Sequence, residues 1–182
     1  MKPSDVVNFW MQAGPKAWFA KSDAFDDQIR TGFEGAHLAA ARGEFAAWAD
    51  TAQGALALLL LLDQFPRNLY RGSAHAFATD PLAKSVAQSA IAEGFDRQVE
   101  ALLRPFFYLP FEHSEALADQ DRALALYETA AAETGDAESL KWAQLHRDII
   151  VRFGRFPHRN ACLGRVTRAE EQAFLDEGGF AG

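Results

Sequence analysis

The segment 52–64, AQGALALLLLLDQ, constrains the fold more than any other part of the chain. Alanine or leucine fills every position from 55 to 62, so apolar side chains would point outward all around a helix. A helix of this kind must be covered by other helices on all sides. The run is also far too short to cross a bilayer. It therefore predicts a central helix, capped by Thr51, in a protein outside the membrane.

Apolar residues elsewhere recur at helical spacing. Phe25, Ile29 and Phe33 follow one another at steps of four, and no segment alternates with a period of two. Trp18 and Phe19, in a connector, are expected to enter the core. The pattern predicts an all-α fold of about eight or nine helices, with antiparallel hairpins where loops are short. The expected helices cover about 3–13, 23–42, 52–64, 80–93, 97–107, 114–133 and 137–153, with a short last helix opened by a capping box from Thr167 to Glu170.

Length and charge narrow the class of protein. The 182 residues suit a single domain over 1–182, with 176–182 as a frayed tail. The formal net charge of -7 argues against general binding to nucleic acid or acidic membranes. The single cysteine, Cys162, permits neither an intrachain disulfide nor a CxxC metal site. The N-terminus lacks the apolar run of a signal peptide, so a cytoplasmic protein is expected.

Two short motifs echo each other and each follows an apolar helix. We call residues 65–72, Phe-Pro-Arg-Asn with Gly72, the first corner, and residues 156–164, Phe-Pro-His-Arg-Asn with Gly164, the second corner. Proline is expected to stop the preceding helix, and glycine to allow close backbone approach. A guanidinium group offers a planar fork of donors for a carboxylate or phosphate. If the corners meet, they predict a ligand site formed by Arg67, Asn68, Arg71, Tyr108, His113, Asp148, Arg155, Arg159 and Asn160.

The same arginines have a plain structural interpretation. They could pair with Asp63, with Asp148 or with backbone carbonyls, and so hold helix ends together. Asp148 and Arg152 also have the spacing of an ordinary helix ion pair. His146 shares a face with Trp142 and is expected to be a core histidine with a satisfied hydrogen bond.

Acid–base chemistry has three candidates: Glu112, His113 and His158. Against it, Ser114 fits a helix N-cap, and Glu115 fits a first helical turn where the dipole favours a carboxylate. Glu112 and His113 are sequence neighbours and cannot share a helix face, so no metal site is predicted. Cys162 has no clear activating neighbour. The common nucleotide-binding and hydrolase motifs are missing, so no cofactor is predicted.

Three long motifs resemble the bacterial family of unknown function numbered 924. They are Asp63–Gly72, Phe106–Glu115, and His146 through Asn160. The resemblance covers nearly the whole chain, including 7–10 and 18–29. It implies a helical fold similar to tetratricopeptide-repeat proteins, a right-handed array of hairpins, and it implies no activity.

Three functions are consistent with these observations. The favoured one is a binding module whose arginine, histidine and asparagine side chains hold a small anion or an acidic peptide terminus. The second is a hydrolase-type enzyme in which His113 or His158 transfers protons and arginines stabilise an oxyanion. The third is a protein-interaction scaffold in which the polar motifs only hold the fold together.

Overall fold

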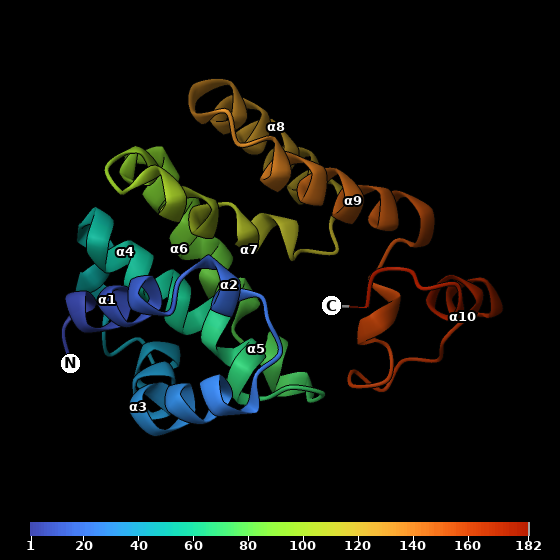
Figure 1. Ribbon diagram of the computed structural model, residues 1–182, viewed down its shortest axis with the longest axis horizontal. Helices are drawn as coiled ribbons and strands as arrows, with labels where there is room; N and C mark the ends of the chain where they lie inside the picture. Colours follow the sequence, from blue (N-terminus) through green and yellow to red (C-terminus); the bar gives the residue numbers. More distant parts are fainter. Residues whose placement is uncertain (182) are drawn as a thin grey trace. The chain divides into compact units, whose positions relative to one another are not determined.

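The fold is all-α, as the periodicity predicts. The computed structural model describes residues 1–181, and no strand occurs within them (Figure 1). 3-10 turns and one π-helical turn join the α-helices. The α-helices are α1 (Pro3–Ala13), α2 (Pro15–Trp18), α3 (Asp23–Ala41), α4 (Ala52–Leu59), α5 (Phe65–Leu69), α6 (Asp80–Ala92), α7 (Leu109–Glu112), α8 (Leu117–Thr134), α9 (Ala137–Phe153) and α10 (Ala169–Asp176).

By its internal contacts the chain divides into two compact units. The first unit comprises residues 1–71 and 75–110, which include α1 to α6. The second unit comprises residues 72–74 and the chain from Phe111 onward, which includes α8 to α10. The first corner thus falls almost entirely in the first unit and the second corner in the second.

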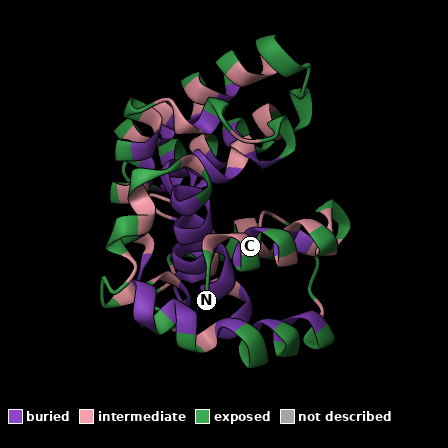
Figure 2. Ribbon diagram, turned by 90° about the vertical axis from the view of Figure 1, so that its left-hand side faces the viewer, coloured by how far each residue is buried: buried purple, intermediate pink, exposed green. Residues whose placement is uncertain are grey.

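The core of the first unit is the predicted central helix. Residues 54–66 are all buried (Figure 2). Helices α1 and α6 pack against α4, and α3 packs against α5. The indole of Trp10 contacts Trp18, Phe65 and Phe106, with ring centroids 5.8, 5.5 and 5.7 Å away. The prediction of a helix covered on all sides is confirmed.

At Gly54 the backbone of the preceding segment lies very close to this helix. Thr51 caps it by accepting a hydrogen bond from Gly54 N, and the preceding 3-10 helix Ala46–Asp50 packs alongside. A Cβ atom at residue 54 would lie 2.0 Å from the carbonyl oxygen of Trp48. We expect Gly54→Ala to lower the free energy of unfolding by about 1–3 kcal/mol, because backbone must move. In the matched control Gly32→Ala on α3, where nothing lies within 4 Å, chemical denaturation should show no loss.

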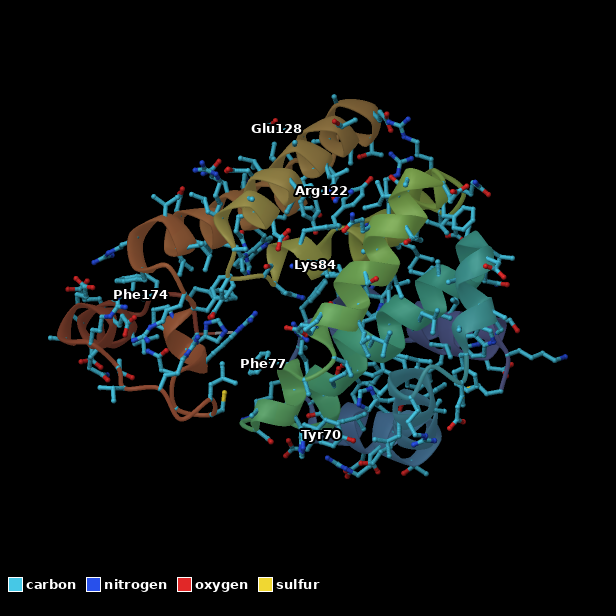
Figure 3. All side chains as sticks on the ribbon, turned by 180° about the vertical axis from the view of Figure 1, so that it is seen from behind. Tyr70, Phe77, Lys84, Arg122, Glu128 and Phe174 are labelled. Atoms are coloured by element: carbon cyan, nitrogen blue, oxygen red, sulfur yellow. The ribbon has the colours of Figure 1, made fainter. Side chains whose placement is uncertain are left out.

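The second unit is built on a helical hairpin. Only Gly135 and Asp136 separate α8 from α9, and Gly135 adopts a left-handed φ of 79°. Asp136 is the N-cap of α9, since its carboxylate accepts hydrogen bonds from the amides of Glu138 and Ser139. Arg122 lies on α8 (Figure 3). Its guanidinium is 4.4 Å from the ring centroid of Phe111.

Two expected features of the chain are wrong. Phe19 is 70% exposed, whereas Trp18 is buried and donates its indole N–H to the carbonyl of Trp10. Residues 97–107 form no α-helix; they contain the end of the 3-10 turn Phe95–Arg97 and all of the 3-10 helix Ala101–Phe107. Glu100 has a non-helical ψ of 140°, and Pro105 has no amide proton for a helical hydrogen bond, so the α-helix predicted from the periodicity does not form.

Two helix starts are displaced from their expected positions. Helix α8 begins at Leu117 rather than at Ser114, because the Ser114 hydroxyl instead donates to the carboxylate of Asp119. The last helix has its capping carboxylate one residue later than predicted. Glu171, not Glu170, accepts the amide of Arg168, at 2.7 Å.

No helix among residues 1–181 combines the length and the apolar character that crossing a membrane requires.

Candidate functional site

The first corner begins with a π-helical turn, Leu60–Gln64, between α4 and α5. The amide of Phe65 donates to the carbonyl of Leu60, five residues back, and Pro66 has no amide to donate. The carbonyls of Leu61 and Leu62 are instead taken by His37 Nδ1, at 2.8 Å, and by the hydroxyl of Thr79. The helix therefore passes through Pro66 and ends at Leu69. The prediction that this proline stops the helix is wrong, and the π-helical turn is the reason.

The Arg67 guanidinium is neutralised inside the first unit. It donates to both carboxylate oxygens of Asp80, at 3.0 and 3.1 Å, and lies 3.4 Å from the carboxylate of Asp63. It also donates to the carbonyls of Asp63 and Ala76. Burial by itself lowers the pKa of Arg67, but the two carboxylates outweigh it and raise the pKa above its usual value. The structural interpretation of this arginine, with Asp63 as its partner, is confirmed.

Asn68 and Arg71 share a single buried carboxylate on α3. Asp26 accepts from Asn68 Nδ2 at 2.8 Å, and from Nε and Nη2 of Arg71 at 2.5 and 3.0 Å. Burial alone would raise the pKa of Asp26, yet the hydrogen bonds from Arg71 and Asn68 hold it below its ordinary value. The carboxylate therefore stays charged and ties α5 to the first turn of α3.

The second corner repeats this arrangement with different elements. Glu171, fully buried on α10, accepts from Asn160 Nδ2 at 3.0 Å and from Nε and Nη2 of Arg155 at 2.6 and 2.7 Å. The bond from Arg155 is the main cause that lowers the pKa of Glu171 to about 2, against a smaller opposing effect of burial. Asn68 and Arg71 of the first corner thus hold one buried carboxylate in the first turn of a helix, as do Asn160 of the second corner and Arg155, which directly precedes that corner.

The backbones of the two corners differ. The first corner is α-helical through Asn68, whereas Gly154 ends α9 before the second corner and Pro157–Arg159 is a 3-10 turn. Both corners do end at a left-handed glycine, with φ of 73° at Gly72 and 65° at Gly164.

Arg159 and Arg165 fix the second corner to the segment before α8. Arg159 Nη1 donates to the carbonyl of His113, and the guanidinium lies 4.5 Å from the ring centroid of Phe156. Glu115 accepts a bidentate pair from Arg165, at 2.7 and 3.0 Å, and the amide of Phe156. Burial raises the pKa of Glu115, but these donors bring it below its ordinary value. Glu115 thus neutralises an arginine instead of compensating a helix dipole.

The acid–base candidates all belong to the second unit. The Glu112 carboxylate lies 2.9 Å from His146 Nδ1, which is also 2.8 Å from the carbonyl of Trp142. Both partners are acceptors, so Nδ1 carries the proton. Burial, followed by the charge of Arg159, lowers the pKa of His158 to about 3, so this imidazole is neutral at pH 7. His146 is buried as predicted, whereas Trp142 on its expected face is 47% exposed.

The remaining sequence candidates are engaged elsewhere. The Tyr108 hydroxyl donates to the buried carboxylate of Asp96 at 2.7 Å. Burial, reinforced by that carboxylate, raises the pKa of Tyr108. Asp148 is exposed and accepts from Gln144, and within residues 1–181 it forms no ion pair with Arg152. Cys162 Sγ donates to the carbonyl of Arg159 at 3.2 Å.

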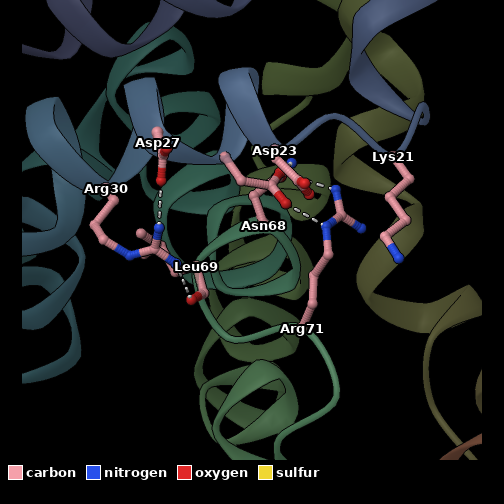
Figure 4. Close-up of a pocket in the computed structure, with 8 residues that line it drawn as sticks. Lys21, Asp23, Asp27, Arg30, Asn68, Leu69 and Arg71 are labelled. Carbon is pink, nitrogen blue, oxygen red and sulfur yellow. Dashed lines mark hydrogen bonds and ion pairs between the residues drawn. The ribbon is translucent and has the colours of Figure 1, made fainter.

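A polar hollow of about 320 Å³ lies in the first unit, between the start of α3 and the end of α5. Asn68 and Arg71, both predicted ligand residues, line it (Figure 4). None of its other lining residues was among the predicted ligand residues. These other lining residues are Lys21, Asp23, Asp26, Asp27, Arg30 and Leu69.

Within the described residues, no group of at least three His, Cys, Asp or Glu side chains is arranged to hold a metal ion. The predicted ligand residues divide between the units: Arg67, Asn68, Arg71 and Tyr108 in the first, and the others in the second. The meeting of both corners around one ligand stays a prediction.

Comparison with known proteins places the chain in a family. No curated protein matches it. A solved structure of a protein of unknown function from Agrobacterium tumefaciens is 50% identical, with 97% of each chain covered and a TM-score of 0.92. The family described as bacterial protein of unknown function, DUF924, matches residues 6–179. The chain therefore belongs to the DUF924 family.

Proposed function

We propose that the protein is a small-molecule binding module whose ligand is a small carboxylate, held in the polar hollow of the first unit. One observation carries the proposal. Two of the three nitrogens of the Arg71 guanidinium bind Asp26, and the third points across the hollow toward the ammonium group of Lys21 (Figure 4). Two cations that face each other favour an anion between them.

The charges around the hollow support a ligand with one negative group. Asp26 pairs with Arg71, and Asp27 pairs with Arg30, which also donates to the carbonyl of Leu69. Each pair is close to neutral, which leaves one further cation, Lys21, and one further carboxylate, Asp23, on the lining. Asp23 repels polyanions. A monocarboxylate therefore fits better than a phosphate or a dicarboxylate.

The arginines of the corners have a different part in this proposal. Arg67 and Arg155 are committed to carboxylates of their own units, so they shape the scaffold and leave recognition to Lys21 and Arg71. The α8–α9 hairpin agrees with a tetratricopeptide-like array as the framework of such a module.

Substitution of Lys21 tests the proposal without disturbing the fold, because this side chain is exposed and the described chain gives it no ion pair. We expect lactate to bind the wild-type protein more tightly than succinate or inorganic phosphate, in titrations followed by NMR chemical shifts. Lys21→Ala should weaken lactate binding about tenfold, the typical effect of losing a charged hydrogen bond worth about 1.4 kcal/mol.

Lys16→Ala is the matched control, since Lys16 is an exposed lysine of the same unit that does not line the hollow. It should bind lactate as the wild type does. Absence of shifts at residues 21–30 and 68–71 in the wild type, or equal affinity of the two lysine variants, would contradict the proposal.

A further inference from the structure

The chain beyond α10 turns back onto the second unit. Helix α10 ends at Asp176, and Gly178 takes a left-handed φ of 81°. The amide of Gly179 donates to the carbonyl of Phe174 at 2.9 Å, and a Cβ atom at residue 179 would lie only 2.5 Å from the Phe174 ring. These two glycines therefore fix the path that carries Phe180 inward.

Phe180 occupies a cage of rings, which we define as Trp142, His146, Phe156 and His158. Its centroid lies 4.5 Å from His146, 5.2 Å from His158 and 6.4 Å from Trp142. The two imidazoles each lie 5.6 Å from Phe156, and Phe180 packs against the buried cluster to which Phe156 belongs. Edge-to-face contacts with His146 and His158 are the geometry that aromatic rings favour.

The walls of the cage are held independently of Phe180. Glu112 and the carbonyl of Trp142 fix the His146 ring, and Phe156 is fully buried against Ile149, Ile150 and Phe153. Phe180 itself is only partly buried and follows the end of the last helix. The cage thus stays formed when the phenyl ring leaves, so a ligand that binds there loses little free energy to ordering these side chains.

The cage also has a polar side. Nδ1 of His158 is buried and has no hydrogen-bond partner within the described residues. The guanidinium of Arg159, the next residue in the chain, lies 4.5 Å from the ring centroid of Phe156, so it places a positive charge beside the cage. A phenyl ring alone uses neither the free nitrogen nor the positive potential. An aromatic ring that bears a negative group would use both.

We propose that the aromatic cage is a binding site for a small aromatic carboxylate, and that Phe180 is its intramolecular occupant, which such a ligand displaces. The site is separate from the hollow of the first unit and does not depend on the function proposed for that hollow. The tail then acts as a competitor tethered to the protein, and it lowers the apparent affinity by the fraction of time it fills the cage.

Titration of the full chain with 3-phenylpropionate tests this directly. We expect Phe180→Ala to bind it at least about tenfold more tightly than the wild type, because the competitor is gone. The imidazole signals of His146 and His158 should shift on binding. Adding His158→Ala to Phe180→Ala should abolish the tight binding, whereas adding Lys21→Ala should leave it unchanged.

Two controls separate displacement from general loosening. Phe174 packs against the same core, with its ring centroid 5.2 Å from that of Phe153, and it is not one of the four cage residues. Phe174→Ala should not tighten binding, even if it lowers the melting temperature. Phe180→Leu, which keeps an apolar side chain without the ring, should bind with intermediate affinity. Equal affinities of Phe180→Ala and wild type, or equal gains from Phe174→Ala and Phe180→Ala, would overturn the assignment.

Discussion

Replacing Arg67 by alanine is expected to lower the free energy of unfolding by about 3–5 kcal/mol, the usual cost of removing one partner of a buried ion pair. The carboxylate of Asp63 is only 1% exposed, and that of Asp80 is 17% exposed. Both would lose the cation that lies between them. The carbonyls of Asp63 and Ala76 would lose a donor as well. Urea denaturation followed by circular dichroism gives the change directly.

The control for this prediction is an exposed arginine pair. Arg42 and Glu44 form an ion pair whose side chains are 59% and 53% exposed, so Arg42→Ala should cost less than about 1 kcal/mol. A double-mutant cycle with Asp80→Asn should show coupling, because both changes remove the same contact. A loss below about 1 kcal/mol for Arg67→Ala would mean that the first corner does not hold the unit together.

Helix positions could be predicted where the signal is local. The buried apolar run 55–62, the cap at Thr51 and the helix 137–153 depend on neighbouring residues, and each of these predictions is confirmed. The π-helical turn could not be predicted in this way. It depends on His37 and Thr79, which are far from it in sequence and donate hydrogen bonds to the carbonyls of Leu61 and Leu62. A proline that looks like a helix stop is tolerated only because those distant donors are present.

The polar corners show the same limit. Their motifs identify Asn68, Arg71, Arg155 and Asn160 as residues with special contacts, but not the carboxylates that they bind. Asn68 and Asp26 are separated by 42 residues, so only the tertiary fold brings them together. Glu171 could have been predicted, because it directly follows Glu170, the carboxylate of the predicted capping box. The box begins one residue later than predicted, so its carboxylate is Glu171.

Glu171 binds the polar groups around the second corner, as Arg67 does in the first. We expect its removal to be the other substitution with a large effect on stability. Its carboxylate accepts from Arg155, Asn160 and the amide of Arg168, and it is fully buried. We expect Glu171→Ala to lower the free energy of unfolding by about 3 kcal/mol at pH 7, since buried donors lose their acceptor. Glu170→Ala is the matched control, because that neighbour is 61% exposed and should cost less than about 1 kcal/mol.

Acid should expose the same carboxylate in the wild-type protein. The pKa of Glu171 is about 2 in the folded state, below its ordinary value of 4.5. The folded state therefore holds its charge more strongly, and the stabilisation is fully present above pH 4.5 and is lost as the pH falls toward 2. Denaturation curves at pH 7, 4.5 and 3 should then converge for wild type and Glu171→Ala as acid is added. A gap between the two proteins that stays constant over this range would show that Glu171 stabilises the corner by packing and not by charge.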